Sequence, residues 1–214
     1  MEKMISVECV SKRVGEARLL SGINLELYGG QVCGIVGRNG SGKSVLLKCI
    51  CGFMSVTEGE IRQGTKRIGT DIPFIEDTGF IIEAPAFLPG KSGFRNLEYL
   101  ARIRRKIGPD RIRECMALVG LSPDDRKPVR KYSLGMRQRL GIAQAIMEYP
   151  SVIILDEPMN GLDNEGVREM RKLFLQLKSE GKALLIVSHN REDIEVLCDT
   201  VYTMDRGYLQ KVTA

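Results

Sequence analysis

The segment VCGIVGRNGSGKS, Val32–Ser44, decides the fold, because an apolar stretch of strand length runs straight into a glycine-rich turn and a helix-forming sequence. Its second half, Gly37–Ser44, matches G-x-x-x-x-G-K-[ST] at every fixed position. The glycines let the backbone curl so that successive N–H groups point at one anion. We therefore predict a buried strand over Val32–Val36, a phosphate-binding loop, and a helix from about Ser44 to Phe53.

This loop carries the side chains that a nucleotide site needs. Lys43 would reach the β- and γ-phosphates of a nucleotide, and the Ser44 hydroxyl would be a ligand of Mg²⁺. A glycine-rich turn that only caps a helix explains neither side chain. The residues expected to bind the nucleotide here are Gly37, Arg38, Asn39, Gly40, Ser41, Gly42, Lys43, Ser44 and Val45.

A second apolar stretch, VIILDEP at Val152–Pro158, predicts a buried strand that ends in two acids. The C-terminal ends of parallel strands meet at one sheet edge, so Asp156 should lie near the phosphate loop. A carboxylate there can hold Mg²⁺, and Glu157 is a candidate to accept a proton from an attacking water. The alternative is that both acids are only solvated loop residues, which is less consistent with the presence of the phosphate loop.

The rest of the chain predicts an α/β fold with a mostly parallel sheet. Residues Met4–Val10 and Ile23–Leu27 alternate apolar and polar, as half-exposed antiparallel strands do, and Ser92–Arg113 is helical and basic. From Met136 onward, helices and continuously apolar strands alternate, which favours a parallel sheet covered by helices. The predicted elements there are a helix to about Glu148, a strand over Ser151–Leu155, a helix over Glu165–Glu180, a strand over Ala183–Val187, a helix over Arg191–Leu197 and a strand over Val201–Met204.

Composition sets broad limits on the protein class. The 214 residues are 43% hydrophobic and 28% charged, which suits one large domain or two lobes with a sizeable core. The net charge of +5 allows a phosphate ligand without demanding nucleic acid. The first ten residues, MEKMISVECV, lack the apolar core of a signal peptide, and no apolar run is long enough to span a bilayer. With six scattered cysteines, these features predict a cytoplasmic protein with reduced thiols.

Taken together, the motifs resemble the ATP-binding subunit of an ATP-binding cassette (ABC) transporter over nearly the whole chain. The matching segments are Gly37–Ser44 (Walker A), Val152–Glu157 (Walker B), Asn160–Asp163 (D-loop), Ser188-His189 (switch histidine) and YSLGMRQR at Tyr132–Arg139, in the position of the signature usually written LSGGQ. The resemblance implies one cassette domain over residues 1–214. Its parts would be a RecA-like P-loop NTPase core with an antiparallel β subdomain (residues 1–83 and 138–214) and an α-helical subdomain (residues 84–137).

The resemblance also implies that the signature works on a second cassette. In this family two cassettes meet head to tail, and the signature helix of one covers the γ-phosphate held by the other. Ser133, the backbone at Gly135 and Asp163 of the D-loop are then expected at the shared nucleotide, although Leu134 replaces the first signature glycine. An ordinary helix cap is the alternative for Ser133.

Three further positions take expected roles from the family. His189, the only histidine, is expected to contact the γ-phosphate and orient the attacking water, although a histidine after a buried strand is often structural. Glu83, in FIIEAP, replaces the usual glutamine and is a candidate Mg²⁺ ligand, the alternative being a strand end without a metal role. Adenine usually stacks on an aromatic residue, whose place Val14 takes beside Arg13. We therefore expect a less selective base site.

The expected partners are a second cassette, identical or not, and a transmembrane permease that docks near Glu83 and holds the subunit at the inner face of the membrane. The Ile-Ile-Glu-x-Pro and SLGM variants resemble ABC-2-type exporters of antibiotics and peptides. One alternative is a soluble ABC ATPase in nucleic-acid maintenance, supported by the basic stretch Arg102–Arg113 but not by the sparse aromatic residues. Another is an assembly ATPase, as in iron–sulfur cluster biogenesis. No nucleic-acid partner is expected.

Overall fold

Strand β3 (Val32–Gly37) lies inside a six-stranded sheet in the computed structural model, which describes residues 2–212. The sheet order is β10-β9-β3-β8-β7-β6, and every neighbouring pair is parallel except β9–β10. The other strands are β6 (Thr78–Ile81), β7 (Val152–Asp156), β8 (Ala183–Val187), β9 (Thr200–Asp205) and β10 (Tyr208–Val212). The predicted α/β fold with a mostly parallel sheet is therefore confirmed.

Strands β7 and β8 are apolar throughout because both faces of the sheet are covered. In β7, Ile153 and Leu155 belong to one hydrophobic core, whereas Val152 and Ile154 belong to a second core on the opposite face. All ten residues of the two strands are buried. Successive side chains on a strand point to opposite faces, so one continuous apolar run supplies both cores.

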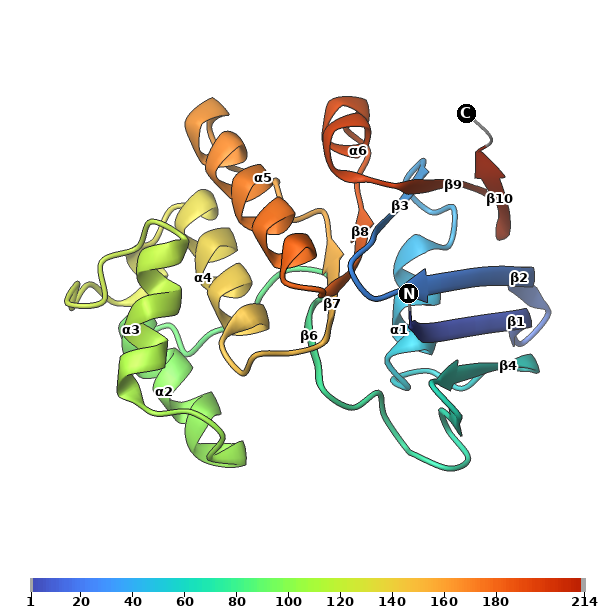
Figure 1. Ribbon diagram of the computed structural model, residues 1–214, viewed down its shortest axis with the longest axis horizontal. Coiled ribbons are helices and arrows are strands. Elements are labelled where there is room, and N and C mark those ends of the chain that lie inside the picture. The colour runs from blue at the N-terminus through green and yellow to red at the C-terminus, as the bar shows by residue number, and fades with distance from the viewer. Residues whose placement is uncertain (1, 213–214) are drawn as a thin grey trace.

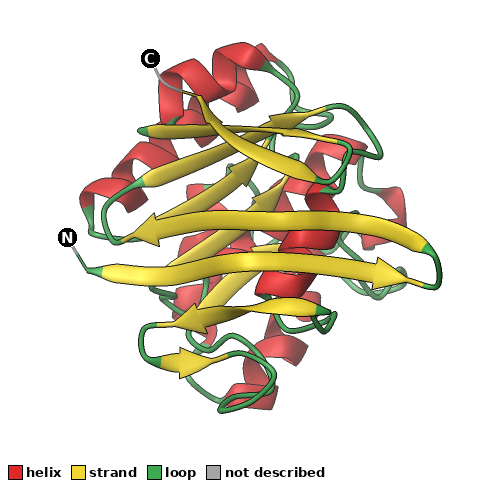
Figure 2. Ribbon diagram, turned by 90° about the vertical axis from the view of Figure 1, so that its right-hand side faces the viewer, coloured by secondary structure: helices red, strands yellow, loops and turns green. Residues whose placement is uncertain are grey.

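The first core lies between the sheet and the helices α2 (Gly93–Arg104), α3 (Pro109–Leu118), α4 (Leu134–Ile146) and α5 (Asn164–Ser179). Figure 1 shows these helices gathered at one end of the molecule. The second core lies between the sheet, α1 (Lys43–Ile50) and a four-stranded antiparallel sheet at the other end (Figure 2). That sheet has the order β2-β1-β4-β5, with β1 (Lys3–Val14), β2 (Ala17–Tyr28), β4 (Glu58–Gln63) and β5 (Lys66–Arg67).

Two helix boundaries correct the sequence-based expectation. The stretch Ser92–Arg113, which we predict to be helical, forms two helices, because Arg105 adopts a left-handed conformation (φ 54°) and α3 begins only at Pro109. Helix α1 ends at Ile50 rather than near Phe53, because Gly52 turns the chain with φ 83°. The short helices η1 (Val129–Lys131) and α6 (Arg191–Leu197) complete the fold. Across residues 2–212, no helix combines the length and apolar character needed to cross a membrane.

Candidate functional site

The phosphate loop closes around its own lysine at the start of α1. Lys43 is 7% exposed, and its ammonium donates hydrogen bonds to the carbonyl oxygens of Gly37 (2.7 Å) and Arg38 (2.9 Å). Gly42 precedes the helix with φ 111°, a conformation that suits glycine. The free N–H groups and the positive end of the α1 dipole therefore face the loop interior beside a buried cation, which suits an anionic phosphate.

Ser44 and Asp156 come together as the sequence predicts. The Ser44 hydroxyl donates to the Asp156 carboxylate at 2.8 Å, although 112 residues separate them, and Asp156 is 8% exposed. The two oxygens form a hard, oxygen-only donor pair of the kind that Mg²⁺ prefers. Among the described residues, no three His, Cys, Asp or Glu side chains form a metal cluster. The pair therefore fits an ion that completes its shell with water and phosphate oxygens.

Glu157 and His189 form a second pair at the same sheet edge. His189 Nδ1 lies 2.8 Å from Glu157 Oε2, and because a carboxylate only accepts, Nδ1 carries the shared proton. The Glu157 backbone adopts φ 50°, its N–H donates to the Val187 carbonyl (2.9 Å), and Gln138 Nε2 donates to its carbonyl (3.2 Å). These bonds hold the Glu157 main chain in place, and its carboxylate contacts His189.

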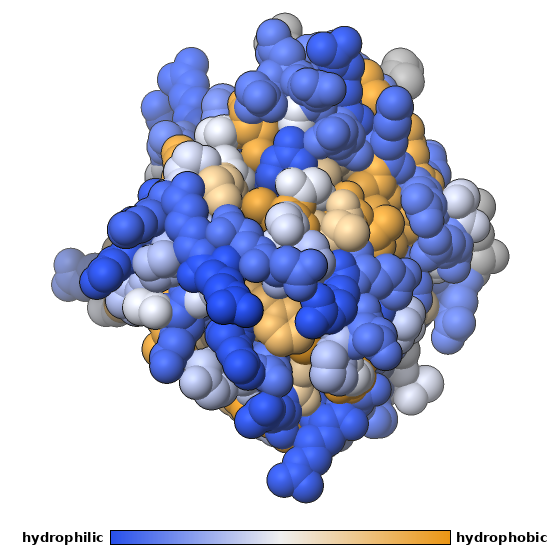
Figure 3. Space-filling view, turned by 90° about the vertical axis from the view of Figure 1, so that its left-hand side faces the viewer, coloured by the Kyte–Doolittle hydropathy of each residue, from blue (hydrophilic) through white to orange (hydrophobic). Residues whose placement is uncertain are grey.

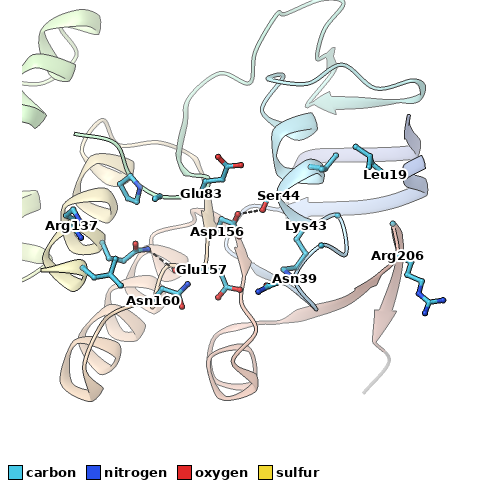
Figure 4. Close-up of a pocket in the computed structure, with 18 of the residues that line it drawn as sticks. Leu19, Asn39, Lys43, Ser44, Glu83, Arg137, Asp156, Glu157, Asn160 and Arg206 are labelled. Atoms are coloured by element: carbon cyan, nitrogen blue, oxygen red, sulfur yellow. Dashed lines mark hydrogen bonds between the residues drawn. The ribbon is translucent and has the colours of Figure 1, made fainter. Parts of the chain in front are cut away.

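Lys43, Ser44, Asp156 and Glu157 border one cavity of about 740 Å³, whereas His189 is not among its lining residues. Figure 4 shows Lys43, Ser44, Asp156 and Glu157 facing the cavity, with Glu83 beside Asp156 in this view. The lining residues expected from the sequence are Asn39, Gly40, Gly42, Lys43, Ser44, Val45, Glu83, Asp156 and Glu157; those added by the structure include Arg18, Leu19, Arg137, Gln138, Asn160 and Arg206. Arg137 and Gln138 lie inside the YSLGMRQR motif, which is the sequence signal that could have identified them.

The signature segment begins α4 with a capped helix start. The Ser133 hydroxyl accepts a hydrogen bond from the Met136 N–H at 3.1 Å, so Ser133 caps the helix. The cap uses the hydroxyl oxygen only, and the hydroxyl proton remains available to donate. Ser133 is exposed and does not line the cavity. A Cβ atom at Gly135 would lie 2.6 Å from the Gly161 carbonyl oxygen, so close packing on the D-loop requires this glycine.

Glu83 is already engaged by a cation from the phosphate-loop helix. Its carboxylate lies 2.5 Å from Lys48 Nζ, and its side chain is 62% exposed. Its backbone has φ 63°, and the next residues run along α4, where a Cβ on Gly141 would meet the Pro85 ring at 2.7 Å. Glu83 therefore borders the cavity and connects α1 with the segment that packs against α4.

Several residues expected at the nucleotide are absent from the cavity lining, namely Val14, Gly37, Arg38, Ser41, Ser133, Gly135 and Asp163. Val14, at the end of β1, is 55% exposed and absent from the lining, whereas Arg18, Leu19 and Arg206 occupy that end (Figure 4). The Asp163 carboxylate caps α5 by accepting from the Gly166 N–H at 2.8 Å. Arg38 contributes its carbonyl to Lys43, and Ser41 is buried with its hydroxyl unpartnered.

Comparison with known proteins agrees with this geometry. The sequence profile of the family described as ABC transporter matches residues 20–160. The uncharacterized ABC transporter ATP-binding protein YybJ of Bacillus subtilis is 38% identical over 97% of this chain and 95% of its own. The bacitracin transport ATP-binding protein BcrA of Enterococcus faecalis is 38% identical over 98% of this chain and 68% of its own.

The fold has close solved counterparts. A dimeric ATP-binding cassette in a post-hydrolysis state with ADP and phosphate superposes with a TM-score of 0.86, over 99% of this chain and 100% of that one, at 22% identity. That similarity concerns the fold. The family match and the relatives carry the assignment: this chain belongs to the ABC transporter family, as an ATP-binding subunit that hydrolyses ATP.

Proposed function

We propose that this ATPase drives export across a membrane as one of two cassettes bound to a permease, which holds it at the inner membrane face. The relative BcrA, named for bacitracin transport, supports an exporter. The observation that carries the pairing is Ser133, whose hydroxyl is exposed outside its own cavity with a free proton to donate. In the proposal, Ser133 and the Gly135 N–H complete the phosphate site of a second copy, beside that copy's D-loop with Asp163.

The chemistry follows from the paired side chains. Loop N–H groups and Lys43 hold the β- and γ-phosphates, and Glu157 accepts the proton of the attacking water. His189 is a positioning residue, because its Nδ1–H fixes the Glu157 carboxylate and its exposed ring can reach the γ-phosphate. Ser44 and Asp156 would hold Mg²⁺, which would supply neutralisation of the phosphate charge. Loss of the γ-phosphate removes the contact that joins the two copies.

The helical subdomain would move as one body in this cycle. We propose that residues 84–137 rotate against the core formed by residues 1–83 and 138–214, with Glu83 at the joint. The Lys48–Glu83 ion pair and the Pro85–Gly141 contact support this, because they lie where the two parts meet. Glu83, which is paired with Lys48 here, would be a candidate metal ligand when the nucleotide is present.

Copurification tests the transport role. Tagged wild-type protein, extracted in mild detergent, should retain a polytopic membrane protein, and nucleotide turnover should change in that complex. A cassette that brings down only soluble proteins, or that binds DNA or RNA in a salt-sensitive way, would favour the assembly or nucleic-acid alternatives.

The metal assignment has its own test. Asp156→Asn should raise the Mg²⁺ concentration needed to bind a fluorescent ATP analogue by about tenfold or more, because one charged ligand is lost. Asp205→Asn, a matched change at the exposed end of β9, should leave that requirement unchanged. An equal Mg²⁺ requirement in Asp156→Asn and wild type would remove Asp156 from the metal site.

A further inference from the structure

Positive charge is concentrated in the helical part of the molecule. Residues 84–137 hold thirteen lysines and arginines against five aspartates and glutamates, although the whole chain has a net charge of only +5. Figure 3 views the molecule from the end that carries α2 and α3, and hydrophilic side chains cover most of that face. The charge excess is therefore a local feature, and it is not expected from the composition of the rest of the chain.

Seven of these thirteen cations have no carboxylate partner among the described residues, and five of the seven lie on two neighbouring loops. Lys91, Arg126, Lys127, Arg130 and Lys131 are all exposed, and none forms an ion pair within the part of the chain that the structure describes. Neighbouring arginines differ: Arg113 pairs with Asp124 at 2.8 Å. Together with Leu88, which is 53% exposed, we call these five residues the basic surface.

The basic surface is assembled from two loops that backbone hydrogen bonds hold together. The Val129 N–H donates to the Lys91 carbonyl (2.9 Å), and the Arg130 N–H donates to the Pro89 carbonyl (3.0 Å). Ser92 and Pro128 form an isolated β-bridge between the same loops. Like charges that lie close together repel one another, so this arrangement stores a repulsion that an anionic partner relieves.

We propose that the basic surface binds anionic lipid headgroups. Its cations are solvated side chains on a surface that lines neither described cavity, so a planar, evenly charged partner fits them better than a shaped one. Leu88 adds the exposed apolar side chain that interfacial contacts use. None of the six residues is aromatic, so nothing there stacks on nucleic-acid bases. The surface would bring the signature segment, which begins directly after Lys131, toward the membrane.

The strength of the contact follows from the number of cations. Each Lys or Arg near an anionic bilayer contributes about 1 kcal/mol, so removing three should lower vesicle partitioning by about 100-fold. Raising salt from about 0.05 M to 0.5 M should weaken the contact steeply, because the Debye length shortens. An apolar insertion alone would respond little to salt.

Vesicle cosedimentation of the full chain tests the proposal without any permease, so its outcome is independent of the transport role. Phosphatidylcholine vesicles are compared with and without phosphatidylglycerol. The test variant carries Lys91→Gln, Arg130→Gln and Lys131→Gln. The control variant carries Lys3→Gln, Lys66→Gln and Arg67→Gln, which remove the same charge from cations paired with acids in the antiparallel β subdomain.

Wild type and control should bind only the anionic vesicles, and the test variant should lose that binding while all three bind ATP equally. If both variants lost vesicle binding equally, the binding would depend on net charge alone and the proposal would be overturned. So would wild-type protein that ignores anionic vesicles, or that binds neutral ones as well. If the test variant instead loses a detergent-solubilised permease while vesicles have no effect, the surface binds an acidic protein segment and the lipid assignment is wrong.

Discussion

Replacing Glu157 by glutamine isolates the proton-accepting step. The change keeps the side-chain length and an oxygen that can accept from His189 Nδ1, now 2.8 Å from the carboxylate. The backbone bonds to Val187 and Gln138 do not involve the carboxylate, so folding should be little affected. Only the ability to take a proton is lost. General-base catalysis typically contributes 10²–10⁴-fold, so kcat should fall by about 100-fold or more.

Single-turnover hydrolysis and ATP binding, measured side by side, separate an effect on proton transfer from an effect on nucleotide affinity. Glu157→Gln should bind Mg-ATP with an affinity near that of wild type while phosphate release is nearly abolished. Glu195→Gln, an exposed acid on α6, is the matched control and should hydrolyse normally. If Glu157→Gln retained kcat within about tenfold of wild type, the base would have to be another group and the Glu157 assignment would fail.

Further predictions concern binding, packing and pH. Lys43→Ala should weaken ATP binding by about 100-fold or more, because charged hydrogen bonds contribute about 1.5–3 kcal/mol each; an affinity within tenfold of wild type, by fluorescence titration, would contradict this. Gly79→Ala places a Cβ 1.7 Å from the Ala145 carbonyl oxygen. It should cost about 3 kcal/mol and lower Tm by about 6–12 °C, and an unchanged Tm in calorimetry would refute the β6–α4 packing. Burial raises thiol pKa values above the unfolded value of about 8.5, so stability should be full below that pH and fall as pH rises above it. Thermal melts from pH 8 to pH 10.5 check this, and Cys51→Ala should flatten the slope. The pKa is raised to about 11 for Cys49 and Cys115, to about 12 for Cys51 and Cys198, and further for Cys33.

The sequence predicts best where local pattern and burial coincide. Strand β8 has the bounds expected for Ala183–Val187, because all five residues are buried and apolar. The sequence does not predict strands β10 and β4. Strand β10 is mostly exposed, only one residue of β4 is buried, and their sequences, YLQKV and EGEIRQ, carry little apolar signal. Such strands are defined by pairing with neighbours, which sequence periodicity does not report.

The phosphate and metal groups were predictable because their spacing is fixed by the chemistry of phosphate binding, as with Lys43 and Ser44. The residues at the adenine end of the cavity could not be predicted in the same way. The pairing of β1 with β2 is irregular near Lys12 and Arg13, and sequence spacing does not report such a shift in register. The Lys48–Glu83 pair joins residues 35 positions apart, and the turn carrying Arg206 lies still further from the phosphate loop in sequence. Only tertiary structure brings these together.

A mixing experiment tests most directly whether two copies share each nucleotide. The Glu157→Gln and Ser133→Arg proteins are each expected to be inactive alone. The first lacks the general base, and the second lacks the signature serine that contacts the partner's nucleotide. In a mixed dimer, the Ser133→Arg copy keeps intact catalytic residues and faces the intact signature of the Glu157→Gln copy. An equimolar mixture should therefore recover up to about a quarter of wild-type ATPase activity, since half of the dimers are mixed and each has one working site. A mixture as inactive as its separate components would contradict the shared site.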